Sequence, residues 1–292
     1  MTYQTLDYSV QDGILTLTLN RPEQMNSFTV EMANELVAAF ERASDEDAVR
    51  AIVVTGAGKA FCAGMDLSKP GNVFGLDEQQ QPTMQDMRER LDDPAIHDGV
   101  RDTGGRVTLA IFNCKKPVIA AINGAAVGIG ATMTLAMDVR LASEKARIGF
   151  VFGKIGIVPE ACSSWFLPRI VGISQALEWC YSGDILTADE AKAGGLVKAV
   201  LPPDQLLPEA IKLARKFVDN RSPVAVALAR QMLYRNAAQP HPIEAHRVDS
   251  LAVFYTSKKD GKEGVKSFLE KRAPSFTSEA SDMPSFYAEW AK

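Results

Sequence analysis

The sequence predicts an α/β fold in which strand, strand, helix units stack into a spiral, followed by a helical C-terminal region. Two observations carry this prediction. Short apolar runs such as residues 51–56 and 117–122 have the form of strands buried on both faces, and the alternation of two strands and a helix recurs along the chain. Beyond Ile173 the apolar residues recur only at helical spacing. Stacked units let each turn of the spiral bury the apolar face of its neighbour.

The first predicted elements are a hairpin and a helix. Residues 6–10 and 14–19 alternate apolar and polar side chains around a turn at Asp12-Gly13, which is typical of paired strands. Thr29 can cap a helix that ends near residues 44–45, because Met32, Leu36 and Phe40 recur at helical spacing. The elements expected next are a strand at 50–56, a long polar loop at 68–101, a helix at 103–113, a strand at 117–122, a helix to about residue 137, and strands at 139–142 and 147–150.

Beyond the last of these strands the pattern becomes helical. We expect helices at 174–181, 187–193, 205–220, 223–237, 242–256 and 261–271. A Leu-Pro-Pro step at residues 201–203 marks a break, because proline ends regular structure. We therefore divide the chain into a spiral core, residues 1–202, and a helical C-terminal region, residues 203–292.

Composition and charge exclude several classes of protein. The chain has 292 residues, of which 46% are hydrophobic and 23% charged, so disordered and fibrous classes are excluded. The formal net charge of −4 argues against a nucleic-acid partner. The four cysteines are widely spaced and form no CxxC pair, so we expect neither a metal site nor a disulfide framework. Four free thiols favour a cytoplasmic location.

One uncharged stretch is long enough to span a bilayer. It covers residues 117–137, but asparagine, threonine and glycine residues interrupt it. This pattern suits a buried strand, a glycine-rich turn and a buried helix better than a membrane span. The N-terminus also lacks the basic and apolar regions of a secretory signal.

Two glycine-containing turns follow predicted buried strands. They lie at residues 63–65 and 128–130. Such a turn directs backbone N–H groups outward at a strand end, and the second also opens a helix, so each can hold an anionic oxygen. Each turn alone is equally explained by glycines that permit tight turns and close packing.

Other kinds of site lack their motifs. The chain has no GxxxxGK[ST] loop, and Gly128-Ile129-Gly130 lacks the third glycine of a dinucleotide fingerprint. It also has no GxSxG elbow for a nucleophilic serine. The histidines lie in the polar loop or the helical tail, so no catalytic triad is expected.

Glu160 is the carboxylate with the most unusual surroundings. Its neighbours from Gly156 to Leu167 are almost all apolar or small. Burial among them would raise its pKa, so that it could accept and return a proton near neutral pH. The alternative is a solvated glutamate that assists a helix cap.

Several motifs occur together along the chain. They are Asn20-Arg21-Pro22 with Asn26, residues 60–67, 116–124 and 128–130, Asp138, and residues 188–197 and 268–272. Together they resemble the enoyl-CoA hydratase/isomerase family, also called the crotonase family. The resemblance covers most of the chain, and residues 68–101 look like an insertion within it. It implies a crotonase-like spiral that acts on an acyl-CoA thioester, needs no cofactor besides the CoA of its substrate, and assembles through its C-terminal helices as a homotrimer or a dimer of trimers.

The resemblance also implies roles for individual residues. The thioester oxygen would lie between the backbone N–H groups of Met65 and Ile129. Lys271 would reach a CoA phosphate from a neighbouring subunit. The alternative is that Lys271 is an exposed lysine at a helix end, where its charge is favourable to the helix dipole. The implied CoA and acyl contacts are Ala63, Gly64, Asp66, Leu67 and Gly128.

The chain departs from the family's hydratases at two positions. Their paired glutamates correspond here to Thr132 and Phe152. The segment around Pro159-Glu160 instead resembles the Δ3,Δ2-enoyl-CoA isomerases, in which one glutamate follows a proline. We therefore expect double-bond isomerisation by a single base, Glu160. The alternatives are hydration of a 2-enoyl-CoA and a non-catalytic acyl-CoA-binding protein.

Overall fold

The computed structural model describes residues 2–68 and 71–291, and two sheets form its centre. The larger has the strand order β1-β2-β3-β5-β7-β10 and is parallel except for the hairpin of β1 and β2. The smaller has the order β4-β6-β8-β9. The strands are β1 (Leu6–Gln11), β2 (Ile14–Leu19), β3 (Ala51–Gly56), β4 (Ala60–Cys62), β5 (Val118–Ile122), β6 (Ala125–Val127), β7 (Val139–Ser143), β8 (Arg147–Gly149), β9 (Ile185–Thr187) and β10 (Ala199–Leu201).

From β3 to β8, successive strands alternate between the two sheets, which confirms the predicted spiral. The pairs β3 and β4, β5 and β6, and β7 and β8 each place one strand in the larger sheet and the next in the smaller. Neighbouring turns of the spiral pair in parallel in both sheets. The carboxyl ends of corresponding strands therefore meet at one edge, where the loops that follow them gather.

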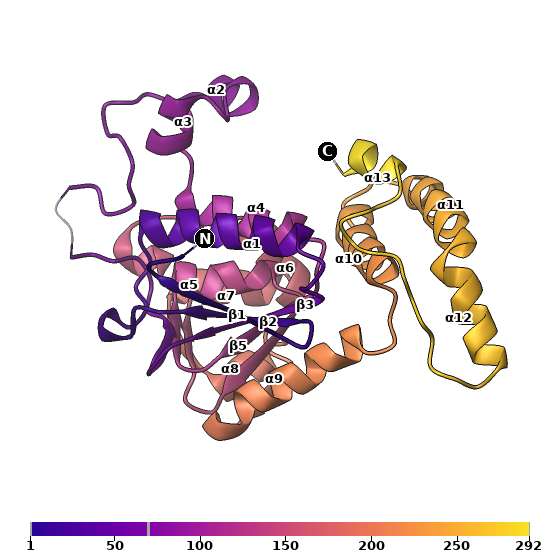
Figure 1. Ribbon diagram of the computed structural model, residues 1–292. Coiled ribbons are helices and arrows are strands. Elements are labelled where there is room, and N and C mark those ends of the chain that lie inside the picture. Colours follow the sequence, from indigo (N-terminus) through magenta and orange to yellow (C-terminus); the bar gives the residue numbers. More distant parts are fainter. Residues whose placement is uncertain (1, 69–70, 292) are drawn as a thin grey trace.

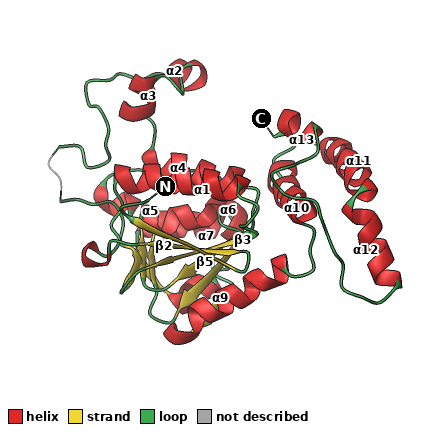
Figure 2. Ribbon diagram, in the orientation of Figure 1, coloured by secondary structure: helices red, strands yellow, loops and turns green. Residues whose placement is uncertain are grey.

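Helices cover both faces of the larger sheet (Figures 1 and 2). On one side α1 (Val30–Asp45) packs against α4 (Thr103–Asn113), and on the other α9 (Pro203–Val218) lies across β3 and β5. Strand β3 is buried on both faces as predicted: Ile52 and Val54 join the core below α1, while Ala51 and Val53 join the core against α9. Apolar residues at four-residue spacing give α9 its buried face.

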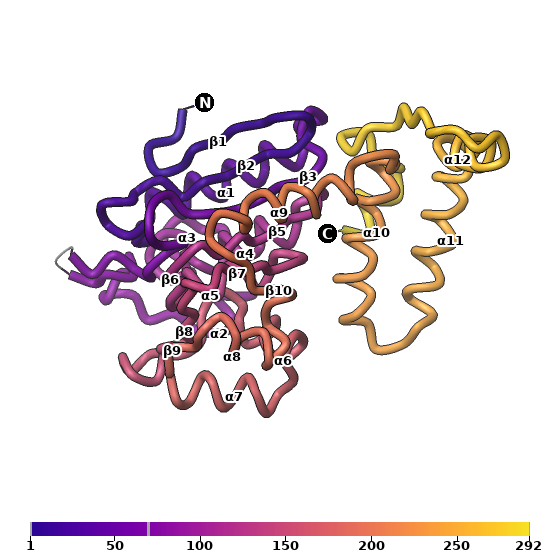
Figure 3. Tube along the Cα trace, turned by 90° about the horizontal axis from the view of Figure 1, so that it is seen from below, coloured from indigo at the N-terminus to yellow at the C-terminus, as the bar shows by residue number. Residues whose placement is uncertain are grey.

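The helices after α9 form an arm beside the spiral (Figures 1 and 3). Val224, Leu228 and Phe286 form part of a small core of its own. The predicted boundary after residue 202 stays a prediction, and α9, which follows it, packs on the larger sheet. The arm consists of α10 (Pro223–Asn236), α11 (Pro242–Lys258), α12 (Asp260–Leu269) and α13 (Phe286–Trp290).

The segment expected as one long loop contains two short helices. They are α2 (Met84–Glu89), which starts with a capping box between Thr83 and Asp86, and α3 (Pro94–Gly99), capped by Asp93. Hydrophobic periodicity could not reveal them, because Ile96 is the only buried residue in either helix. Residues 69–70 of the segment lie outside the described residues. Pattern analysis also missed α6 (Ser163–Val171), β6, β9, β10 and α13.

Across the described residues, every helix is too short or too polar to cross a bilayer. The uncharged stretch at 117–137 forms β5, β6, the one-turn helix α5 (Ile129–Thr132) and a 3-10 helix at Met133–Ala136. All residues of β5 are buried. This agrees with the predicted buried strand and turn, and the predicted helix to residue 137 is divided between the two helical types.

Candidate active site

The two glycine turns lie side by side because the strands before them are neighbours. Strands β4 and β6 pair in parallel, so their following turns leave the same edge. Gly128 has a φ of +54°, a backbone conformation that residues with a side chain rarely adopt. A Cβ on Gly130 would lie 2.0 Å from the carbonyl oxygen of Cys62. Glycine at this position therefore lets α5 approach β4 closely enough to bring the turns together.

The backbone N–H groups of Met65 and Ile129 both belong to these turns. Two nearby N–H groups of the first turn are used within the protein: that of Ala63 donates to the Met25 carbonyl (3.1 Å) and that of Asp66 to the Phe28 carbonyl (2.9 Å). Ile129 is the first residue of α5, where N–H groups lack helical partners. Neither the Met65 nor the Ile129 N–H donates a hydrogen bond to another described residue. Two free donors therefore border one cavity.

The cavity has a volume of about 380 Å³ and a mostly apolar wall. The turns supply Ala63, Gly64, Met65, Leu67, Gly128 and Ile129, all of which the sequence assigned to the site. The segment between β4 and α4 adds Phe74, Leu76 and Val100, which pattern analysis did not identify as site residues. Among the described lining residues, Asp102 and Glu160 are the two with ionisable side chains.

Glu160, the residue that the sequence predicted as the base, lies at the cavity wall and is half-buried. Burial raises its pKa to about 8, and the nearby negative charge of Asp102 acts in the same direction. The hydroxyl of Thr132 donates a hydrogen bond of 2.6 Å to Oε1, which opposes the rise. A carboxyl group with this pKa can take up and release a proton near neutral pH.

Asp102 is the ionisable residue of the cavity wall that sequence analysis missed. It caps α4 by accepting the Gly104 N–H (2.9 Å), and its other oxygen accepts the Ala161 N–H (2.6 Å). The local signal was an aspartate directly before a predicted helix, a common N-cap. Nothing in the sequence indicated that this cap lies beside a glutamate 58 positions further on.

Asp66 and Lys271 lie outside the cavity wall. The Asp66 side chain accepts hydrogen bonds from Ser68 and Arg21, which hold the pKa of its carboxyl well below the usual range. It thus shapes the turn at residues 63–67. Lys271 follows α12 in the arm and is exposed. Their contacts with CoA stay predictions.

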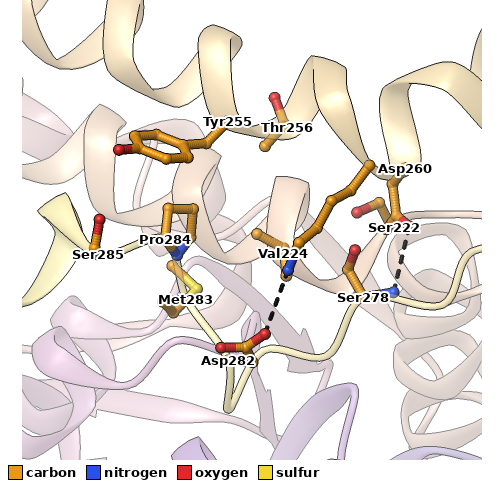
Figure 4. Close-up of a pocket in the computed structure, with 11 residues that line it drawn as sticks. Ser222, Val224, Tyr255, Thr256, Asp260, Ser278, Asp282, Met283, Pro284 and Ser285 are labelled. Atoms are coloured by element: carbon orange, nitrogen blue, oxygen red, sulfur yellow. Dashed lines mark hydrogen bonds and ion pairs between the residues drawn. The ribbon is translucent and has the colours of Figure 1, made fainter.

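A different pocket, of about 260 Å³, lies in the arm (Figure 4). Asp260 accepts hydrogen bonds from the N–H groups of Thr277 (3.2 Å) and Ser278 (3.3 Å), and Lys259 donates to Asp282 (3.4 Å). These contacts tie the segment before α13 to α12. The polar groups of the arm pocket therefore serve packing, and the cavity that contains Glu160 is the better candidate for catalysis.

Comparison with known proteins places nearly the whole chain beside one family. The family model for enoyl-CoA hydratase/isomerase matches residues 9–93 and 82–279. An enoyl-CoA hydratase of Alternaria alternata is 40% identical, covering 91% of this chain and 83% of that protein. A 1,2-epoxyphenylacetyl-CoA isomerase of Escherichia coli K12 is 32% identical, covering 92% and 96%. The solved structure of a Bacillus anthracis enoyl-CoA hydratase superposes with a TM-score of 0.79 at 30% identity, covering 94% and 100%.

Proposed function

Because the chain belongs to the enoyl-CoA hydratase/isomerase family, we propose that it converts 3-enoyl-CoA thioesters into the conjugated 2-enoyl-CoA isomers, with Glu160 as the single proton carrier. One observation carries the proposal: Glu160 faces an apolar cavity bordered by the free N–H groups of Met65 and Ile129. This arrangement supplies both requirements of a proton shift next to a thioester. These are a base and stabilisation of the charge that its action creates.

The two N–H groups stabilise the enolate. When a proton leaves C2, negative charge develops on the thioester oxygen, and the Met65 and Ile129 N–H groups would both donate to it. Donors held in place before the reaction lower the barrier, and removal of one typically costs about 10²–10³-fold in rate. The glycine turns hold these donors on neighbouring strands.

Glu160 moves the proton. Its carboxylate takes the proton from C2, the double bond shifts from C3–C4 to C2–C3, and the same carboxyl returns the proton to C4. No water enters the reaction. Since the pKa of Glu160 is about 8, the group is basic enough to accept the proton and acidic enough to return it.

Hydration of 2-enoyl-CoA is the second candidate. Asp102 favours it, because it gives the cavity a second carboxylate. The relative from Alternaria alternata also carries the name of a hydratase. Against it, the resemblance places the two glutamates of hydratases at Thr132 and Phe152, and neither residue has a carboxylate.

The test is turnover of matched 3-enoyl-CoA and 2-enoyl-CoA substrates of several chain lengths, with products identified by chromatography and mass. We expect the 3-enoyl substrate to become the conjugated isomer at unchanged mass. Glu160→Gln should reduce this turnover by about 10²-fold or more while CoA-ester binding persists, and exposed Glu178→Gln should leave it unchanged. Gain of one water by the 2-enoyl substrate would establish the hydratase instead. Binding without turnover of either would indicate an acyl-CoA-binding protein.

We also propose that the arm mediates assembly into a homotrimer or a dimer of trimers. Phe254, Val265 and Phe268 on α11 and α12 are 52%, 62% and 82% exposed, and a second copy of the chain would cover them. Light scattering should give a mass of three or six chains, and Phe268→Glu should reduce that mass. A monomer at all concentrations would contradict the proposed assembly.

We propose that Lys271 contacts a CoA phosphate from a neighbouring subunit. Lys271→Gln should therefore raise the KM for CoA esters but not for esters of a CoA fragment without the nucleotide phosphates.

A further inference from the structure

Resting on the proposed role of Glu160, we infer that Asp102 is a positioning residue, whose carboxylate fixes the turn that carries Glu160 and places a negative charge beside it. Asp102 is the N-cap of α4, while Glu160 precedes α6. Asp102 therefore couples two helices that converge at the cavity.

Two backbone hydrogen bonds use both oxygens of Asp102. Oδ1 accepts the Gly104 N–H at 2.9 Å, and Oδ2 accepts the Ala161 N–H at 2.6 Å. The first bond holds the start of α4, and the second holds the residue that directly follows Glu160. Because both oxygens already accept backbone N–H groups, Asp102 is better suited to hold its charge in place than to exchange protons with substrate.

The turn after Glu160 needs such a partner. Ala161 and Cys162 have φ values of +54° and +55°, in a region that residues with a Cβ adopt at an energetic cost. Cys162 is the N-cap residue of α6 but makes no side-chain capping bond. The bond from Ala161 to Asp102 therefore stabilises a strained turn, and this turn sets where the Glu160 carboxyl lies.

The start of α4 also limits where the Glu160 carboxyl can go. A Cβ on Gly104 would lie 2.4 Å from Oε2 of Glu160 and 2.4 Å from Cδ1 of Ile129. Oε1 meanwhile accepts the Thr132 hydroxyl. The carboxyl group is thus bounded by α4 on one side and α5 on the other.

The charges around Glu160 are negative or neutral. Asp102 faces it from α4, Cys62 from β4 and Cys162 from its own turn. Burial raises the pKa of both thiols, that of Cys62 to about 12, so they stay uncharged near neutral pH. The described lining includes no lysine, arginine or histidine. Asp102 is therefore the charge that Glu160 senses most directly, although its exposure to solvent lets salt weaken the effect.

The test measures Glu160 titration without any substrate. The free energy of unfolding is measured against pH for the chain, Glu160→Gln, Asp102→Asn and the double variant. The difference that Glu160→Gln makes in each background reports the pKa of Glu160. We expect Asp102→Asn to lower that pKa by about one unit at low salt, and by less at high salt. Asp102→Ser, which keeps a capping hydroxyl, should act in the same direction if the asparagine variant folds poorly.

Kinetics provide the second readout. Asp102→Asn should reduce the limiting kcat by about 10-fold or more because Glu160 is less well placed, while KM changes less than about twofold. As pH rises, the kcat of Asp102→Asn should also reach its plateau at a lower pH than the kcat of the unmodified chain. Exposed Asp98→Asn is the matched control, since its side chain contacts His97 and does not line the cavity.

The outcomes separate this inference from the proposed reaction. An unchanged Glu160 titration in both Asp102 variants would overturn the inference even if isomerisation is observed. A lowered pKa in a protein that does not isomerise 3-enoyl-CoA would support the charge effect and contradict only the proposed reaction. If Asp102→Asn abolishes hydration of 2-enoyl-CoA at every pH, Asp102 is a second proton-transferring group, and the positioning role is wrong.

Discussion

The Thr132 hydroxyl donates a 2.6 Å hydrogen bond to Oε1 of Glu160, joining the end of α5 to the turn before α6. Thr132 is fully buried. The resemblance places a hydratase glutamate at this position. Here the position is a threonine, and its hydroxyl contacts the carboxyl group of Glu160. Thr132 therefore contacts the residue that we propose as the single base.

Thr132→Val should move the pH dependence of turnover to higher pH. The hydroxyl stabilises the charged form of Glu160, so its removal raises the pKa further above 8. Because a general base acts when deprotonated, kcat/KM at pH 7 should fall by about tenfold, and less at pH 10. Thr134→Val is the control, since buried Thr134 donates to Ala131 instead. An equal loss at every pH would contradict a role through the pKa.

Glu160→Gln should stabilise the fold at alkaline pH. The pKa of Glu160 is raised in the folded state, from 4.5 to about 8, so the chain loses stability as pH rises between these values and the change is complete above them. Glutamine avoids this loss. We expect a gain of about 2–5 kcal/mol at pH 9 and little difference at pH 4. Urea unfolding of both proteins at both pH values measures this difference in the free energy of unfolding. A gain of equal size at pH 4 and pH 9 would contradict the raised pKa of Glu160.

Gly104→Ala should damage catalysis more than it destabilises the chain. The new methyl group would meet Oε2 of Glu160 and Cδ1 of Ile129 at 2.4 Å, so the base must move, and kcat should fall about 10²-fold. Alanine also favours the helix by about 1 kcal/mol over glycine, which offsets part of the strain. The matched control is Gly264→Ala in α12, where the new methyl group would meet Phe276 at an ordinary contact distance of 3.7 Å. Full activity of Gly104→Ala would show that the site tolerates a displaced carboxyl.

Arg230→Met should destabilise the junction of the arm and the core. The guanidinium of Arg230 is buried, pairs with Asp138 at 3.0 Å and donates to carbonyls at the end of α4, including those of Ile111 and Phe112. Removal leaves Asp138 without this partner, at a cost of about 3–5 kcal/mol. Exposed Arg247→Met, which breaks a surface pair with Glu244, should change stability by less than about 1 kcal/mol. Thermal unfolding compares them, and equal melting temperatures would contradict this role.

Local pattern predicted much of the spiral. Alternation in β1 and β2, the capped apolar face of α1 and the continuous apolar run of β3 all appear where expected. Each depends on side chains close together in the sequence, so periodicity reveals it. The strand β6 was missed because three residues are too few to show a period. The helices α2 and α3 were missed because their caps, rather than a buried face, define them.

The sequence by itself determined the spiral, the two glycine turns and the candidacy of Glu160, because these depend on local composition and on glycines at fixed offsets from buried strands. The tertiary structure decided what surrounds Glu160. Asp102 and Gly104 come from the start of α4 and Thr132 from the end of α5, and their positions follow from the parallel pairing of β4 with β6 and the packing of α4. A pKa is set by burial and by charges a few ångströms away, and sequence separation does not encode those distances.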